Sequence, residues 1–201
     1  MGGFHAPEHP PAGSLAQRTY KPLLKPGQHK VIGFARRSQG LMVAPGNPLG
    51  LQSLADVARI RARFVNRALG TGTRVLVDEL LAEQQLAPRA IAGYERHEPS
   101  HAAVAHAIRS GQADAGLGLE SAARAAGPAF HLRVHARYDL VCLKTALEQP
   151  ATQALLAVLR SAAWQHQLGT LPGYEAVASG EVQSLRALLP WWTFKLDKSP
   201  G

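Results

Sequence analysis

The chain has 201 residues, of which 46% are hydrophobic and 18% are charged. This is the composition of a globular protein, and it excludes an intrinsically disordered chain. The 22 lysines and arginines exceed the 14 aspartates and glutamates and give a formal net charge of +8, which favours anionic partners, whether large or small.

The first quarter of the chain predicts little regular structure. Residues 1–30 are rich in proline, glycine and histidine and show no periodicity, so we expect a loop or an extended arm. In VIGFARRSQGLMV (31–43) we expect two short apolar segments separated by a polar turn. Ser53 has the chemistry of a helix N-cap and predicts a short helix over LADVARIRA.

The rest of the chain alternates between strand-like and helix-like segments. Expected strands are RFVN (63–66), IAGY (91–94), ADAGLGLE (113–120) and FHLRVHARYDLVCL (130–143). Expected helices run from Val75 to about Gln85, from Ser100 to Gly111, over SAARAAG (121–127) and over ATQALLAVLRSAAWQHQL (151–168), before an aromatic end that frays. This alternation favours an α/β fold with a largely parallel sheet.

The segment NRALGTGTR (66–74) is expected where a strand gives way to a helix. Its glycines allow a ligand to approach the backbone, its threonines offer hydroxyl groups, and the helix start offers unpaired N–H groups and a positive dipole end. Its arginines add charge-assisted hydrogen bonds. The pattern fits a structural tight turn and an anion site equally well. The candidate ligand residues are Arg67, Thr71, Gly72, Thr73 and Arg74.

A second helix start, EPSH (98–101), offers a similar choice. Ser100 either caps its own helix or presents its hydroxyl to the same ligand. His101 would lie in the first turn, where the helix dipole keeps the imidazole neutral but still able to donate one hydrogen bond. Both residues are therefore candidate ligand residues.

Metal and catalytic chemistry find no support in the sequence. His101 and His106 are five residues apart, which separates them by about 140° around a helix, and no third ligand accompanies His131 and His135. The HExxH and GxSxG motifs and a nucleotide-binding GxxxxGK[ST] loop are all absent. The single cysteine, Cys142, lies in an apolar run, so we expect a buried thiol. We therefore expect a protein that is not an enzyme and has no cofactor or metal.

Four segments, beginning ARRSQGLMV, RFVNRALGTGTR, IAGYERHEPSH and ARYDLVCL, follow one another in an order that resembles a known family. The chain resembles the type II periplasmic-binding-protein-like domain of bacterial molybdate-sensing helix-turn-helix regulators, which is related to molybdate- and tungstate-binding proteins. The resemblance runs from about Gly3 to Glu181, and its most specific parts are NRxxGxGTR and SGxADxGLG.

The resemblance implies two α/β lobes around a cleft, with an oxyanion held by hydroxyl groups and helix-end N–H groups. The implied first lobe comprises 31–62 and 138–190, the second lobe 63–137, with an arm at 1–30 and a tail at 191–201. Tyr138 matches a position at which a tyrosine hydroxyl reaches the anion, although a strand tyrosine that packs on the sheet fits the sequence as well.

The chain departs from the family pattern in two places. The usual GSGTR is GTGTR here, which keeps the hydroxyl and adds a methyl group. The chain begins with MGGFHAPE, at the end of a segment that relatives carry in full, so we expect an incomplete first lobe and no DNA-binding head. Exposed sheet edges would then favour a homodimer or a partner that completes the lobe.

The sequence therefore predicts a module that binds a small oxyanion, molybdate or tungstate first, within a transcriptional regulator or an uptake system. One alternative keeps the fold and binds an organic anion or a pterin-like molecule, with Tyr94, Tyr138 or Tyr174 supplying a flat wall. Another is a basic nucleic-acid-binding protein, although the basic residues are dispersed. The N-terminus lacks the apolar core of a secretory signal, so we expect a cytoplasmic protein with no membrane partner.

Overall fold

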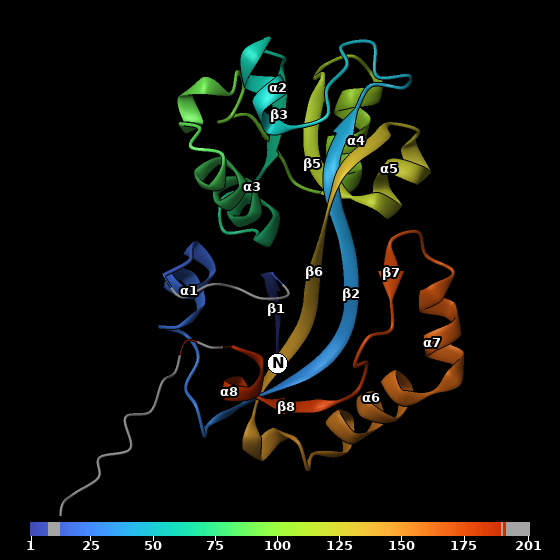
Figure 1. The fold of residues 1–201 in the computed structure, drawn as a ribbon. Helices are drawn as coiled ribbons and strands as arrows, with labels where there is room; N and C mark the ends of the chain where they lie inside the picture. Colours follow the sequence, from blue (N-terminus) through green and yellow to red (C-terminus); the bar gives the residue numbers. More distant parts are fainter. Residues whose placement is uncertain (8–12, 190, 192–201) are drawn as a thin grey trace, which may run out of the picture.

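The structure is a computed structural model that describes residues 1–7, 13–189 and 191. Its strands form one curled sheet with the order β1-β6-β2-β5-β3-β4, and β7 and β8 add to the free edge of β2 (Figure 1). The strands are β1 (Gly2–Pro7), β2 (His29–Val43), β3 (Phe64–Arg67), β4 (His97–Glu98), β5 (Ala115–Leu119), β6 (Ala129–Leu143), β7 (Tyr174–Glu175) and β8 (Val182–Ser184).

Two long antiparallel strands, β2 and β6, run the length of the molecule and join two lobes (Figure 1). We call residues 44–128 the upper lobe, and residues 1–7, 13–28, 144–189 and 191 the lower lobe. The helices of the upper lobe are α2 (Leu54–Arg59), α3 (Gly72–Glu83), α4 (His101–Arg109) and α5 (Glu120–Ala126). Those of the lower lobe are α1 (Leu15–Tyr20), α6 (Pro150–Arg160), α7 (Ala162–Gly169) and α8 (Leu185–Leu188).

In the upper lobe, helices cover both faces of the sheet. On one face, Leu76, Val77 and other apolar residues of α3 pack with α2 and with Leu41 of β2. On the other face, Val104 and Ile108 of α4 pack against Met42. Burying a side chain of this size stabilises the fold by about 1.5–3 kcal/mol. The alternation of Leu41 and Met42 along β2 therefore fixes α3 and α4 on opposite faces.

The lower lobe is built around the other ends of the same two strands. Leu185 and Leu189 pack on Val31 on one face, together with Trp191, and Leu156 and Leu159 of α6 pack on Ile32 on the other. The lobes also touch away from the long strands, because α3 contacts both α1 and β1. Within residues 1–7, 13–189 and 191, no helix combines the length and apolar character that crossing a bilayer requires.

The predicted α/β fold is confirmed, but the prediction of a largely parallel sheet is wrong. In the described part of the chain, the parallel pairs are those of β3 with β4 and with β5, whereas β2 is antiparallel to β5, β6, β7 and β8. The expected polar turn within residues 31–43 does not exist either, since β2 is continuous there. Its polar residues Arg37, Ser38 and Gln39 are buried where the strand passes between the two lobes.

Three other expected elements differ from the structure. Residues 91–94 form a turn rather than a strand, because Gly93 has a φ of +88° and lies against the backbone of Phe64. Residues 1–30, expected to be loop, contain β1 and α1. The single helix expected over 151–168 is divided at Ser161, whose extended backbone ends α6 and whose hydroxyl accepts from the Trp164 N–H at 3.2 Å to cap α7.

The local helix signals are confirmed. The Ser53 and Ser100 hydroxyls cap α2 and α4, and α4 ends at Ser110 before Gly111, as predicted. The domain boundaries stay a prediction, but α2, which lies in the range 31–62 assigned to the first lobe, packs with α3. The fraying predicted for the C-terminal end falls on residues outside the described part of the chain, apart from Trp191, which is buried.

Candidate functional site

Three helices of the upper lobe begin at the edge of the sheet that faces the lower lobe (Figure 1). Strands β3, β4 and β5 are parallel to one another, and each leads directly into a helix, namely α3, α4 and α5. Their carboxyl ends therefore meet at one edge, which is where open α/β sheets bind ligands. The two predicted ligand segments, 66–74 and 98–101, both lie at this edge.

The turn before α3 has two backbone N–H groups that no residue of the described part of the chain engages. Thr71 is the N-cap, and its hydroxyl donates to the Ala68 carbonyl at 2.8 Å and accepts from the Arg74 N–H at 3.4 Å. Gly70 has a φ of +83°, the left-handed conformation that favours glycine. Among the described residues, no hydrogen bond engages the N–H groups of Gly72 and Thr73, the first two residues of the helix. These two donors remain available to an anion.

The Thr73 hydroxyl is already engaged. It donates to Oε1 of Gln39 at 2.7 Å, and both side chains are buried. Gln39 belongs to β2, so this bond joins the start of α3 to the strand that passes between the lobes. The hydroxyl proton that the sequence offers to a ligand is therefore directed at Gln39 instead.

The two arginines of the turn hold the site together. The Arg67 guanidinium donates from Nη1 to the Glu98 carbonyl at 3.1 Å, which links the start of α3 to the segment that leads into α4. Burial lowers the pKa of Arg67, because the charged form is partly removed from water. Neither this contact nor the burial identifies Arg67 as a direct ligand residue.

Arg74 is more deeply buried and has its own partners. Its side chain is 5% exposed, and the guanidinium carbon lies 4.0 Å from the centre of the Tyr94 ring. Carboxylate oxygens of Asp78 and Glu95 lie 3.7 and 3.8 Å from its nitrogens. Burial, and then the hydrogen bond from its hydroxyl to Asp78, raise the pKa of Tyr94. Arg74 thus fixes segment 91–98 against α3.

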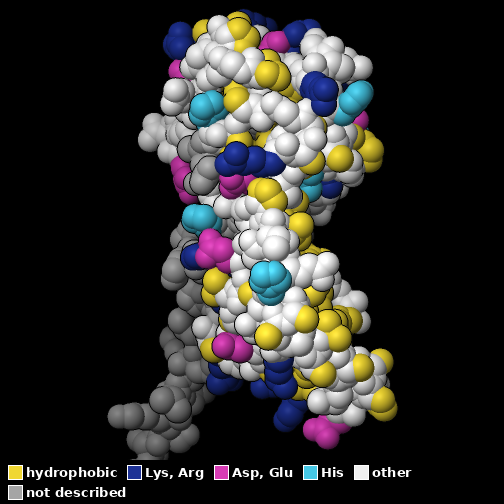
Figure 2. Space-filling model, turned by 90° about the vertical axis from the view of Figure 1, so that its right-hand side faces the viewer, with side chains coloured by type: hydrophobic (Ala, Val, Ile, Leu, Met, Phe, Trp, Pro, Cys, Tyr) yellow, Lys and Arg dark blue, Asp and Glu magenta, His cyan; other side chains and the backbone are white. Residues whose placement is uncertain are grey.

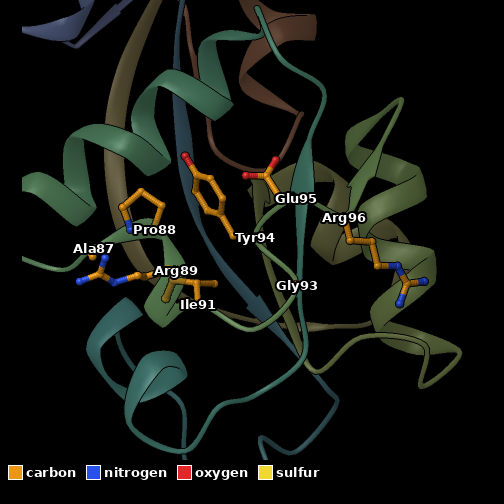
Figure 3. A pocket seen from close by; sticks show the side chains of 8 residues that line it. All are labelled: Ala87, Pro88, Arg89, Ile91, Gly93, Tyr94, Glu95 and Arg96. Atoms are coloured by element: carbon orange, nitrogen blue, oxygen red, sulfur yellow. The ribbon is translucent and has the colours of Figure 1, made fainter.

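Residues 87–96, which overlap this segment, form a hollow with a volume of about 610 Å³ (Figure 3). Figure 3 shows Tyr94 extending from residues 87–96 toward α3, and Arg96 pointing the other way, where it donates to the Gln112 carbonyl at 2.7 Å. The residues that line this hollow all lie between Ala87 and Arg96. None of them belongs to the turn 66–74, so the hollow is separate from the donors of Gly72 and Thr73.

The second predicted ligand segment lies across the sheet edge from the first. The Ser100 hydroxyl accepts from the Ala103 N–H at 3.0 Å, as an N-cap does, and the residue is exposed. The His101 ring lies over β5, where a Cβ atom at Gly118 would be 3.4 Å from its Nδ1. Neither α3 nor α4 has an acidic residue in its first turn. Both helix starts therefore keep their positive dipole ends without an internal counter-charge.

The third helix start is different. The first residue of α5 is Glu120, which is 5% exposed and forms an ion pair with Arg124 at 3.2 Å. A carboxylate at this position already interacts with the helix dipole and repels other anions. The start of α5 is therefore not an anion site.

Tyr138 lies on β6 opposite Ala35, away from the turn of α3 along the long strands. The guanidinium carbon of Arg37 lies 4.5 Å from the centre of its ring, and the Phe34 ring meets it edge-on with centroids 5.3 Å apart. The ring of Tyr138 therefore packs against neighbouring side chains, as the packing alternative expects. A ligand role for its hydroxyl stays a prediction.

Sequence reasoning missed two buried polar residues of β2, Arg37 and Gln39. Both lie on the face of β2 that carries Leu41, because side chains two residues apart share a face. The signal was present in the alternation of residues 35–43, but the polar stretch at 36–39 was interpreted as a turn. Among the described residues, no group of three histidine, cysteine, aspartate or glutamate side chains is arranged to hold a metal ion.

Comparisons with known proteins identify the family. A model described as the PBP superfamily domain matches residues 1–160, and the chain therefore belongs to this family. The chain is 36% identical over 152 residues to the uncharacterized protein YvgK of Bacillus subtilis (strain 168), an alignment that covers 76% of this chain and 49% of YvgK. The chain thus spans about half the length of this curated relative.

Solved structures show the same fold at low sequence identity. Peb3 from Campylobacter jejuni is 20% identical with a TM-score of 0.52, and the match covers 72% of this chain and 67% of that one. The regulatory domain of MetR, a LysR family regulator from N. meningitidis, is 9% identical with a TM-score of 0.54, covering 76% and 72%. These similarities establish a type II periplasmic-binding-protein-like fold and no more.

Proposed function

We propose that this chain, as a PBP superfamily domain, binds a small oxyanion at the first turn of α3 and has no catalytic activity of its own. Molybdate and tungstate are the first candidates. The observation that carries the proposal is the pair of N–H groups of Gly72 and Thr73, which have no hydrogen-bond partner among the described residues. An anion at a helix start gains about 0.3–1 kcal/mol from the dipole, and more where the site is partly buried.

The charges around the turn support an oxyanion over a ligand that needs an arginine clamp. Arg67 is bonded to the Glu98 carbonyl, and Arg74 stacks on Tyr94 near two carboxylates. Neutral donors at the turn bind an oxyanion without an adjacent counter-charge, because hydrogen bonds to a charged group contribute about 1.5–3 kcal/mol each. This chemistry fits a small oxyanion that accepts hydrogen bonds over its whole surface.

The alternative ligands receive less support. An organic anion or a pterin-like molecule needs an accessible ring face, and Arg74 and Arg37 already cover one of the two faces of Tyr94 and of Tyr138 respectively, which reduces the ring surface that these tyrosines offer. A nucleic-acid-binding surface gathers its charge, whereas lysine and arginine side chains are spread over the face in Figure 2. Both observations favour the small oxyanion.

The signal of binding in this proposal is a change in how the lobes sit relative to one another. The lobes are joined by β2 and β6, whose pairing is irregular between Gly33 and Ala35 and again between Gln39 and Leu41. Such irregularities bend strands locally. An anion that contacts both lobes would favour a closed arrangement by its differential affinity. A regulator or an uptake system would read that change.

The test is calorimetric titration of the purified chain with sodium molybdate and sodium tungstate, with sulfate and phosphate as controls. We expect molybdate or tungstate to bind with a dissociation constant in the micromolar range or below, which corresponds to a favourable binding free energy of about 8 kcal/mol or more. Both should bind more tightly than the two controls. The absence of binding heat with all four anions would contradict the proposal. In a further titration with nucleic acid, binding of nucleic acid but of none of the anions would favour the nucleic-acid alternative.

A further inference from the structure

The buried amide of Gln39 is the polar group in β2 that the proposed site does not yet use. Gln39 is 2% exposed and lies between Val134 of β6 and Leu119 of β5, its register partners on either side. An amide has one acceptor and two donor hydrogens. Gln39 Nε2 is not among the fully buried side-chain atoms of the described residues that lack a hydrogen-bond partner, so this nitrogen is not enclosed and a ligand can reach it.

Among the described residues, only the acceptor half of the amide has a hydrogen-bond partner. Oε1 accepts the hydrogen bond of the Thr73 hydroxyl at 2.7 Å. The nitrogen, Nε2, forms no hydrogen bond with any residue that the structure describes. Because Nε2 and Oε1 share one carbon atom, Nε2 lies beside the same first turn of α3. This donor therefore belongs to the same helix turn as the N–H groups of Gly72 and Thr73, which also have no hydrogen-bond partner among the described residues.

We propose that Gln39 is a ligand-binding residue of this site, whose Nε2 donates to the anion while its Oε1 fixes Thr73. The inference rests on the proposed oxyanion function and adds a residue from the strand between the lobes. The anion would then contact the upper lobe through α3 and the connecting strand through Gln39. Occupancy of the site would act directly on β2, next to the irregular pairing between Gln39 and Leu41.

A neutral amide suits this position better than a charged side chain. A carboxylate would repel the anion, and an ammonium buried at this depth would require a counter-charge. The amide donates to the ligand and accepts from Thr73 at the same time, which neither a lysine nor an ionised glutamate can do. We therefore expect position 39 to tolerate a charged side chain less well than a neutral one.

The test compares Gln39→Met and Gln39→Glu with the wild-type chain, using sodium molybdate as the probe in calorimetry. Gln39→Met keeps the length of the side chain but removes both the donor and the acceptor that Thr73 uses, and we expect affinity to fall roughly 10- to 100-fold. Gln39→Glu should abolish binding near neutral pH and regain it as the pH is lowered from about 8 to about 5.5, because burial beside an anion raises the pKa of a carboxyl group. If the thermal stability of Gln39→Glu without anion recovers in parallel as the pH falls, the effect is on folding and contradicts a direct role of residue 39 in binding.

Controls separate this inference from the proposed function. Gln165→Met, on the exposed surface of α7, should bind like wild type. Thermal unfolding without anion shows whether each variant is folded, and if Gln39→Met is not, Gln39→Asn retains the amide but withdraws it by one methylene and should also weaken binding. If wild type binds molybdate and Gln39→Met binds equally well, the role of Gln39 is wrong and the proposed function stands. If wild type binds none of the four anions, both are wrong.

Discussion

The starts of α3 and α5 lie at the same edge of the same sheet, and yet they are chemically opposite. Each follows a strand of the parallel trio, and each presents backbone N–H groups toward the lower lobe. The first residue of α5 is the buried carboxylate Glu120, whereas the first residue of α3 is Gly72, with no acid in its first turn. A carboxylate at the first residue thus closes a helix start to an anion, whereas its absence is one condition for the backbone donors to remain available to a ligand.

Placing a carboxylate at the start of α3 should break this difference and produce the largest effect. In Gly72→Glu, the new side chain takes the position that Glu120 holds in α5. We expect molybdate affinity to fall by at least about 100-fold, because opposed like charges cost several kcal/mol. Calorimetry measures the affinity, with Gly72→Ala as the control for the added Cβ atom. Unchanged affinity in Gly72→Glu would place the anion elsewhere.

Removing Arg74 should show that the turn of α3 depends on the contacts between Arg74 and segment 91–98, which have no counterpart at the start of α5. Arg74 stacks on Tyr94 and lies near Asp78 and Glu95. We expect Arg74→Met to lower the free energy of unfolding by about 2 kcal/mol. Chemical denaturation measures this, with Arg89→Met on the exposed side of the same segment as the control. An equal loss of unfolding free energy in both variants would contradict the role of Arg74 in holding segment 91–98 against α3.

The local chemistry of these helix starts could be predicted from the sequence, but their surroundings could not. An N-cap such as Ser100 bonds to a backbone group three residues ahead, so its signal is contained in a short segment. The contact between Thr73 and Gln39 joins residues 34 positions apart, and it depends on how β2 pairs. Because the polar stretch at 36–39 looked like a turn, the continuous strand and its buried polar residues were missed.

The antiparallel sheet shows the same limit. Alternating strands and helices indicate parallel pairing only where each helix returns the chain to the same edge, as from β3 to β4 and on to β5. The strand β2 instead pairs with β6, which lies far along the chain. Likewise, the sequence suggested that Arg67 and Arg74 point at a ligand, and only the packed structure reveals Glu98 and Tyr94 as their partners.

Neutralising the carboxylate of α5 sharpens the comparison from the other side. In Glu120→Gln, the interaction with the helix dipole and the ion pair with Arg124 are lost. We expect the free energy of unfolding to fall by about 1 kcal/mol and molybdate affinity to stay unchanged. Denaturation and calorimetry test the two parts, with Glu83→Gln at the exposed end of α3 as the control. A new anion site in Glu120→Gln would mean that the first residue alone makes the site.

The smallest expected effect concerns the contact that joins the beginnings of β3 and β5, the two strands that lead into α3 and α5. Arg63 and Asp114, just before β3 and β5, are joined by the hydrogen bond from the Arg63 N–H to the Asp114 carboxylate at 2.8 Å. Hydrogen bonding from the Arg63 side chain holds the pKa of Asp114 below its ordinary value of 3.8. A depressed pKa in the folded state means that the stabilisation is present at neutral pH and is lost as the pH falls through the folded value.

We therefore expect Asp114→Asn to be less stable than wild type by about 0.5 kcal/mol at neutral pH, since the pair is near the surface. The difference should shrink toward zero as the medium is made more acidic than the ordinary pKa of 3.8. Denaturation curves collected over this range measure it. A difference that stays constant across the range would show that Asp114 acts through its shape rather than its charge.

The most direct measurement of the central claim is the molybdate affinity of Gly72→Pro against Gly72→Ala. Proline is well accepted as the first residue of a helix, and Thr71 already has the extended backbone, φ −84° and ψ 145°, that a residue before proline adopts. The two variants therefore differ chiefly in one backbone N–H. If that N–H binds the anion, Gly72→Pro will bind molybdate roughly 10- to 100-fold more weakly than Gly72→Ala. Equal affinities would contradict an anion site at the start of α3.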